Sequence, residues 1–287
     1  MTHVELQPDL LPLLGRVDNV LDGIAGFVEH YDFSKANSSY EARVQAVSMV
    51  ASICYQSPKA LGSISLFDRL QAESGGLPSS SYEMCPVLLT NKQFQQGNFK
   101  HCWKFGEQLD SNYLLTNLRA LIEDVGPDES LNYLNTDPAE LQIIRDNFKV
   151  FLFNVDLSTR AQMVRHRVSW QELSRRYVSG TKSPFEFYTS AKLNKVTSNY
   201  SFDEFQQDDE LDTDDIIDIC LNHYNSAIAS GVKPEEARRI LPQAMMTQIW
   251  GAFQPSQLDN WFKLRLNPHA QSEIRMVAQA MQELING

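Results

Sequence analysis

The sequence predicts an α+β fold with a small central sheet flanked by several helices. Apolar residues recur at helical spacing in several segments, most clearly in residues 40–55 and 215–231. One segment, residues 147–156, is typical of a strand because its apolar run is bounded by polar residues. Helices outnumber strands in an irregular order, which favours α+β over a regular alternation of strand and helix.

The expected elements follow from local start and stop signals. A proline at a first-turn position opens residues 138–147, and glycines end residues 112–126 and 215–231. Asn267 is expected to cap a C-terminal helix that has Pro268 in its first turn. Residues 183–190 are expected to be extended. Helices are predicted for residues 17–30, 40–55, 112–126, 138–147, 215–231 and 267–287, and a further one through residues 245–253.

Length and composition describe an ordinary globular chain. Its 287 residues are 43% hydrophobic and 21% charged, and no linker long enough to separate domains interrupts them, so a single domain is expected. No apolar run approaches the ~20 residues that a membrane helix needs. No basic region precedes the apolar residues near the N-terminus, so we expect no secretory signal, no membrane partner and a cytoplasmic location.

Charge and cysteine content exclude several function classes. The formal net charge is −11, and eight acids without a base in residues 203–215 account for −8 of it. We interpret that run as a solvated loop leading into a helix. The acidic balance argues against nucleic-acid binding. The four cysteines form no CxxC pair and no ligand spacing with histidine, so free thiols are expected and no metal site.

A basic stretch contrasts with this acidic background. Between residues 160 and 176, Glu172 is the single acid among six basic side chains: Arg160, Arg165, His166, Arg167, Arg175 and Arg176. Such a cluster repels itself unless an anion lies in it, and arginine binds phosphate oxygens bidentately. The alternative is a helix face paired with the acidic run at 203–215.

Two further arginines, Arg238 and Arg265, lie next to apolar residues in separate segments. Arginines in such surroundings usually have a specific anionic partner. That partner is either a ligand or a local glutamate, such as Glu235 or Glu273.

Five motifs follow one another in the sequence: RHR, then S-x-RY, then EFY, then A-R-x-x-LP, then N-x4-R followed by HAQ-x-EIR. This ordered set resembles the flavin-dependent thymidylate synthase (thymidylate synthase complementing protein) family. The match runs from Phe151 to about Arg275, with weaker echoes at 43–55 and 77–89. RHR alone is not specific, but the ordered set is.

The resemblance implies a site for two ligands, with FAD as cofactor. The positions that match dUMP contacts are Gln162, Arg165, Glu172, Ser174, Arg176, Arg238 and Arg265. The positions that match FAD contacts are Ser80, Glu83, Arg165, His166, Arg167, Gln171, Asn260, Leu264 and His269.

The resemblance also implies the reaction. The family reduces FAD with NADPH and transfers a methylene group from methylenetetrahydrofolate to dUMP, which yields dTMP, in a site shared among subunits of a homotetramer. Arg176 would stabilise negative charge on the uracil, and Ser174 would contribute a binding hydroxyl near the ring. No cysteine stands in a context that suits the nucleophile of an ordinary thymidylate synthase.

Several features depart from the family pattern. Six residues, VSWQEL, separate RHR from the serine, where the family usually has seven. Pro78 and Met84 replace the histidines of the family's N-terminal loop, and Gln254 and Ser256 replace residue types often used for flavin contacts. An N-terminal extension of about 1–39 and an insertion of about 90–148 are also expected. These departures leave a second hypothesis open, a nucleotide-binding module of the same fold that has lost flavin and catalysis.

Overall fold

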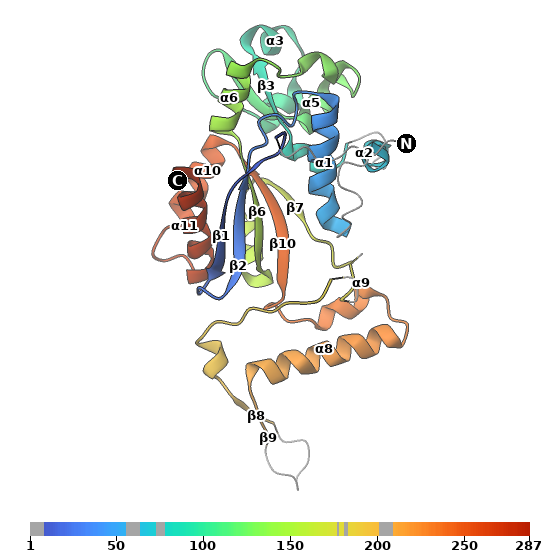
Figure 1. Ribbon diagram of the computed structural model, residues 1–287, viewed down its shortest axis with the longest axis vertical. Helices are drawn as coiled ribbons and strands as arrows, with labels where there is room; N and C mark the ends of the chain where they lie inside the picture. The colour runs from blue at the N-terminus through green and yellow to red at the C-terminus, as the bar shows by residue number, and fades with distance from the viewer. Residues whose placement is uncertain (1–8, 56–63, 73–77, 177, 181–182, 201–208) are drawn as a thin grey trace.

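The protein is described by a computed structural model that covers residues 9–55, 64–72, 78–176, 178–180, 183–200 and 209–287. Its centre is a five-stranded antiparallel sheet with the order β1-β2-β6-β10-β7 (Figure 1). The α+β prediction with a small central sheet is confirmed, as is the strand predicted for 147–156. The strands are β1 (Leu13–Leu21), β2 (Ala25–Tyr31), β6 (Lys149–Asp156), β7 (Ser169–Glu172) and β10 (Met246–Phe253).

The helix predicted for residues 17–30 is wrong, because this segment forms the β1–β2 hairpin. Asp22 and Gly23 both have positive φ angles, of 48° and 71°, and make the turn that reverses the chain. An Asp-Gly pair between apolar runs is a strong hairpin signal. The expected N-terminal extension therefore supplies two strands of the central sheet, and Val28 of β2 is fully buried.

The helix predicted through residues 245–253 is also wrong. This segment is β10, which pairs with β6 on one side and β7 on the other. Seven of its eight residues are buried, so no polar face shows in the sequence. A short apolar run of this kind cannot be assigned to strand or helix by periodicity alone.

Helices cover both faces of the central sheet (Figure 1). Residues on one face, such as Phe153 and Phe253, pack with Trp261 and the C-terminal helix. Trp250 and Ala252 point to the opposite face and join a second core with the predicted helix at 40–55, which is confirmed. The helices concerned are α7 (Leu157–Met163), α10 (Pro255–Arg265) and α11 (Ser272–Asn286) on the first face, and α1 (Tyr40–Tyr55) on the second.

Residues 86–147, which overlap the predicted insertion of about 90–148, lie above the central sheet in Figure 1 and share a hydrophobic core with α1 and that sheet. We call residues 86–147 the inserted lobe; its sheet has the order β3-β5-β4. The helix predicted for 112–126 is wrong in its first part, which is a strand, while the helix at 138–147 is confirmed. The elements are β3 (Pro86–Thr90), α3 (Asn91–Gln96), α4 (Lys100–Phe105), β4 (Glu107–Gln108), β5 (Tyr113–Asn117), α5 (Leu118–Val125), the 3-10 turn η3 (Glu129–Tyr133) and α6 (Pro138–Asn147).

A third group of elements lies beyond the other end of the central sheet (Figure 1). The helix predicted for 215–231 is confirmed as α8 (Thr213–Ala229). Residues 203–208 of the acidic run lie outside the described residues. The other elements here are η4 (Leu193–Lys195), β8 (Ser198–Tyr200), β9 (Asp209–Leu211), α9 (Pro234–Ala237) and η5 (Arg238–Ile240).

Two segments differ from the predicted boundaries. The C-terminal helix begins at Ser272, later than predicted, because the Asn267 side chain accepts from His269 N in a separate turn before it. Extended structure at 183–190 is limited to a bridge between Phe187 and Met245.

The remaining elements are α2 (Ile64–Ala72) and η2 (Ser80–Met84). Within the described ranges, every helix is too short or too polar to cross a membrane.

Candidate ligand-binding site

The RHR motif occupies the connection between α7 and β7. The Asp156 side chain caps the start of α7 by accepting from Ser158 N at 3.0 Å. After the helix ends, His166 N donates to Met163 O at 3.0 Å, which folds the motif back against the helix. Pairing of β7 with β10 then fixes the direction in which the chain leaves. The motif is therefore held at both ends by regular structure.

His166 points inward, whereas the arginines on either side of it are exposed. The imidazole is 8% exposed, and its ring centroid lies 4.8 Å from that of Trp261. Burial first, and the Arg265 charge second, lower the pKa of His166 to about 4. The ring is therefore neutral at pH 7, and its Nε2 accepts a hydrogen bond from Arg265 Nε at 2.7 Å.

Arg265, the last residue of α10, connects this helix to the RHR motif and to α7. Besides His166 it binds α7, through Nη2 to Gln162 O at 2.8 Å. The local ion pair with Glu273, which was the alternative for this arginine, is replaced by these two bonds. Burial and the neighbouring Arg165 lower the pKa of Arg265. Both causes disfavour the charged guanidinium, so an anion bound here would relieve the repulsion.

These residues line a hollow of about 420 Å³, which we call the cationic pocket. Six of the predicted site residues meet in it, from segments about a hundred positions apart in the chain. Of the described residues that form its walls, three are arginines and none is a carboxylate, so the pocket attracts anions. Its lining is Arg165, His166, Arg167, Val168, Ser256, Gln257, Asn260, Leu264 and Arg265.

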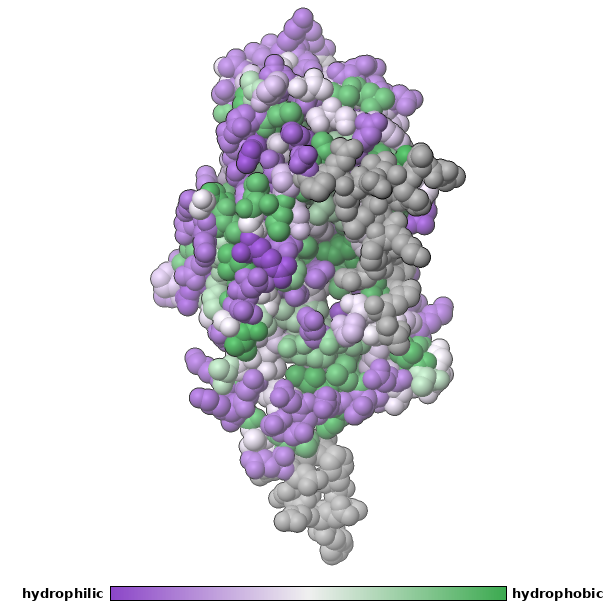
Figure 2. Space-filling model, viewed as in Figure 1, coloured by the Kyte–Doolittle hydropathy of each residue, from purple (hydrophilic) through white to green (hydrophobic). Residues whose placement is uncertain are grey.

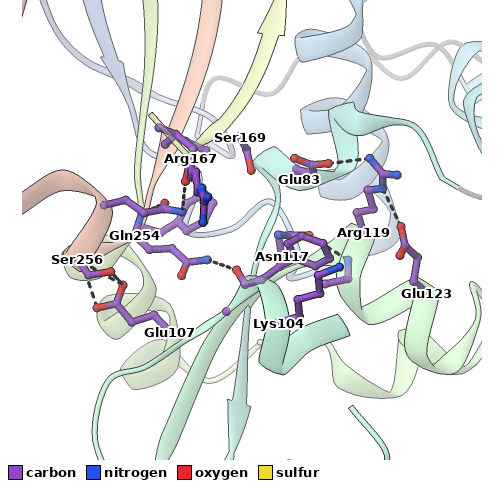
Figure 3. A pocket seen from close by; sticks show the side chains of 17 residues that line it. Glu83, Lys104, Glu107, Asn117, Arg119, Glu123, Arg167, Ser169, Gln254 and Ser256 are labelled. Atoms are coloured by element: carbon purple, nitrogen blue, oxygen red, sulfur yellow. Dashed lines mark hydrogen bonds and ion pairs between the residues drawn. The ribbon is translucent and has the colours of Figure 1, made fainter. Parts of the chain in front are cut away.

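A larger hollow of about 750 Å³, the junction pocket, lies between the RHR motif and the inserted lobe (Figure 3). It shares Arg167, Val168, Ser256 and Gln257 with the cationic pocket, so the two adjoin. Its other walls are Glu83, Lys104, Phe105, Gly106, Glu107, Asn117, Arg119, Ala120, Glu123, Phe148, Ser169, Ala252 and Gln254. The residues of the inserted lobe were not predicted, since nothing local in the sequence connects positions 104–123 to the RHR motif.

Two other predicted residues of the basic stretch, Glu172 and Arg176, lie at and beyond the opposite end of β7. Arg176 is exposed and pairs with Glu235 of α9, Nε to Oε2 at 3.1 Å. Glu172 forms an ion pair with Arg160 and accepts from Thr247 Oγ1 at 3.3 Å.

The remaining positions predicted for dUMP are divided between the two ends. Ser174 is half-buried beside Arg176, and Arg238 is exposed in η5. Gln162 lies on the RHR side, where its Nε2 donates to Gln271 Oε1 at 2.6 Å. Within one chain, the positions predicted for dUMP therefore lie in two separate groups, one near the RHR motif and one near the opposite end of β7.

The predicted flavin positions outside the RHR motif are also separated. Ser80 Oγ donates to Gln171 Oε1 at 2.6 Å, so these two lie together on the α1 side of β7. Glu83 lines the junction pocket and accepts from Arg119 Nη1 at 2.7 Å. His269 is exposed and lines neither pocket.

Cys54 lies closer to the predicted site than its sequence context indicated. Gln171 Nε2 donates to its sulfur at 2.7 Å, and the thiol donates to Glu172 O at 3.2 Å. Burial raises the pKa of Cys54, so the thiol stays protonated near neutral pH. The thiolate is the nucleophilic form, and the fold does not favour it here.

Comparisons with known proteins relate the C-terminal part of the chain to one family. The sequence profile of the thymidylate synthase complementing protein family matches residues 145–287, which include the RHR motif, β10, α10 and α11. This C-terminal part of the chain therefore resembles the family. The family's profile leaves the inserted lobe outside its match, apart from the last residues of α6.

Individual relatives named flavin-dependent thymidylate synthase match about half of the chain. A flavin-dependent thymidylate synthase of Aquifex aeolicus is 33% identical over 52% of this chain and 48% of its own length. Another, of Geobacter sulfurreducens, is 29% identical over 48% of this chain and 56% of its own. The chain therefore spans about half the length of these relatives. A crystal structure of the UMP/dUMP methylase PolB from Streptomyces cacaoi is 23% identical over 47% of this chain and 67% of its own, with a TM-score of 0.37.

The buried histidine predicts a pH dependence of stability. Because the folded-state pKa of His166 is lower than its usual value of about 6.5, the unfolded chain binds more protons between pH 6.5 and 4. The free energy of unfolding should fall through this window as the pH is lowered, by about 2 kcal/mol at pH 5 from this group. His30, whose pKa burial also lowers to about 4, adds to the fall.

Urea unfolding at pH 7 and pH 5 measures this effect. The variant His166→Gln keeps an acceptor for Arg265 but does not titrate, so its loss of stability should be smaller than that of the unchanged protein. Equal losses in both proteins would show that His166 is not protonated on unfolding.

Proposed function

We propose that this chain is an FAD-dependent thymidylate synthase that methylates dUMP reductively to dTMP, with methylenetetrahydrofolate as one-carbon donor and NADPH as reductant. The observation that carries the proposal is the cationic pocket. It joins the RHR motif to Arg265 and Asn260 within the region that matches the family. The relatives' names support the same reaction.

The two adjoining pockets fit a flavin dinucleotide. Phosphates need concentrated positive charge, which the described walls of the cationic pocket supply: Arg165 and Arg167 would face the flavin dinucleotide, and Arg265 would face the phosphate of dUMP. A ring system needs a larger hollow with apolar surface and a few polar groups, which the junction pocket has. FAD, when bound, supplies the hydride chemistry, and the protein supplies position and charge.

We assign His166 a positioning role. Its Nε2 accepts from Arg265, and its ring is enclosed against Trp261, so the imidazole is held in one orientation. It holds the guanidinium of Arg265 at one angle, and Gln162 O holds it from the other side. A fixed arginine stabilises charge on a ligand without having to reorganise.

The second group of residues, around Ser174 and Arg176, would hold the uracil. An arginine beside the uracil carbonyl stabilises the negative charge that develops on the ring. The thiol of Cys54 remains protonated, so we assign it no nucleophilic role.

The separation of the two groups supports an assembly in which each site takes residues from more than one subunit. Apolar side chains are exposed near α8, among them Ile216 and Ile219 with 43% and 51% exposure. Figure 2 shows hydrophobic surface in the lower third of this face, in the region of α8 and α9. We propose a homotetramer, for which light scattering should give about four times the 32.7 kDa chain mass. A monomer would contradict it.

The visible spectrum of the purified protein tests the cofactor half of the proposal. We expect a yellow protein, or one that becomes yellow on adding FAD, and bleaching of the colour by NADPH without air. The matched variants are Arg167→Ala, which removes a pocket arginine, and Arg239→Ala, which removes an exposed arginine paired with Glu236. Only the first should lose flavin. A colourless protein that binds dUMP would favour the nucleotide-binding module instead.

A further inference from the structure

The junction pocket differs in charge from the cationic pocket beside it. Three cations, Lys104, Arg119 and Arg167, face three carboxylates, Glu83, Glu107 and Glu123. Arg119 is neutralised by two of them, with Nη1 at 2.7 Å from Glu83 Oε1 and Nε at 2.8 Å from Glu123 Oε1 (Figure 3). A phosphate gains little in such surroundings, so the pocket suits a neutral group.

Hydrogen bonds from Gln254 and Ser256 fix the part of the pocket wall that the inserted lobe supplies. Gln254 Nε2 donates to Phe105 O at 2.8 Å, directly after β10. The carboxylate of Glu107 accepts from Ser256 N and from Ser256 Oγ, at 3.0 and 2.8 Å, at the first turn of α10 (Figure 3). These bonds cross between the lobe and the family-matched region. The pocket is therefore preformed rather than dependent on closure.

The wall offers groups that recognise a flat heteroaromatic ring. Phe105 is 48% exposed at the pocket, and Phe148 closes part of it. Asn117 lines the pocket while its Oδ1 accepts from Ala120 N at 3.0 Å, so its amide nitrogen is the atom that can donate to a ligand. Aromatic contact plus an amide donor is a usual way of binding a ring that carries nitrogen and oxygen acceptors.

We propose that the inserted lobe binds a heteroaromatic ring of the dinucleotide cofactor, through Phe105 and Asn117, while the phosphates lie in the cationic pocket. The inference rests on the proposed flavin function and extends it to residues that the family's profile does not cover. It gives the lobe a ligand-binding role.

Two lobe variants and one control test this on the full chain. Phe105→Ala removes the aromatic surface, and Asn117→Ser removes the amide while keeping a side chain that can cap α5. The control is Trp103→Ala, which removes an aromatic residue that is 45% exposed on the same helix, packs on Phe94 and does not line the pocket. Thermal melting verifies that each variant folds.

The probes are FAD, FMN and ADP, measured by flavin fluorescence and calorimetry. The combined Phe105→Ala, Asn117→Ser variant should bind FAD roughly tenfold more weakly. If ADP weakens too and FMN does not, the adenine occupies the junction pocket; if FMN weakens and ADP does not, the isoalloxazine does. Either result supports the proposal.

Other results would overturn it. FAD affinity unchanged in the combined variant, or reduced equally by Trp103→Ala, would remove the lobe from the site while leaving the flavin function intact. If the unchanged protein binds none of the three probes, the proposed flavin function fails and this inference fails with it.

Discussion

Replacing Arg265 with alanine should weaken dUMP binding by about 2–4 kcal/mol, as expected when a buried charged hydrogen bond to a ligand is lost. Arg265 lines the cationic pocket and donates hydrogen bonds both to His166 and to Gln162 O of α7. Its removal takes a cation from the pocket and leaves the buried Nε2 of His166 without its donor. Both consequences reduce the stabilisation of an anionic ligand.

Calorimetric titration with dUMP measures the effect. The control is Arg275→Ala, which removes a half-buried arginine of α11 that donates to Pro268 O at 2.9 Å and does not line the cationic pocket. Arg265→Lys keeps the charge but not the fork that reaches His166 and Gln162 together, so its loss should be intermediate. Unchanged dUMP affinity in Arg265→Ala would remove this residue from the nucleotide site.

Replacing Trp261 with alanine should lower the free energy of unfolding by about 3–5 kcal/mol. The indole is fully buried and packs against Trp170, Phe253 and His166. Alanine would leave a large cavity between α10 and the sheet. Because the same indole packs against the His166 ring, we expect weaker ligand binding in the folded variant as well.

Urea unfolding monitored by circular dichroism gives the stability change. Trp261→Phe keeps an aromatic ring and should lose less than the alanine variant, while Trp103→Ala, at an exposed position, should change stability by about 1 kcal/mol or less. A loss below about 1 kcal/mol in Trp261→Ala would show that the indole is not central to this core.

The strengths and errors of the sequence predictions have physical causes. The helices at 40–55, 138–147 and 215–231 were predictable because each has a clear local pattern of apolar spacing or end signals. The strand β10 was not, because it is buried on both faces and its apolar residues show no alternation. The β1–β2 hairpin was missed because its apolar positions also fit a helix, and only the Asp22–Gly23 turn decides between them.

The site was predictable to the extent that it is local in sequence. The RHR motif and the N-x4-R motif predicted residues that the fold brings into one pocket, since each motif occupies a single connection or a single helix. The separation of Arg165 from Arg176 could not be foreseen, because it depends on the four-residue strand β7 between them. Neither could Lys104 or Asn117, which reach the pocket through tertiary packing of the lobe.

The most direct test of the proposed function is to follow dTMP formation by the purified protein without air. The reaction would contain FAD, NADPH, methylenetetrahydrofolate and dUMP, with Arg165→Ala as the variant that lacks a pocket arginine. We expect dTMP in amounts that exceed the enzyme and depend on both FAD and NADPH, and little or none from the variant. A protein that binds FAD and dUMP but forms no dTMP under these conditions would contradict it.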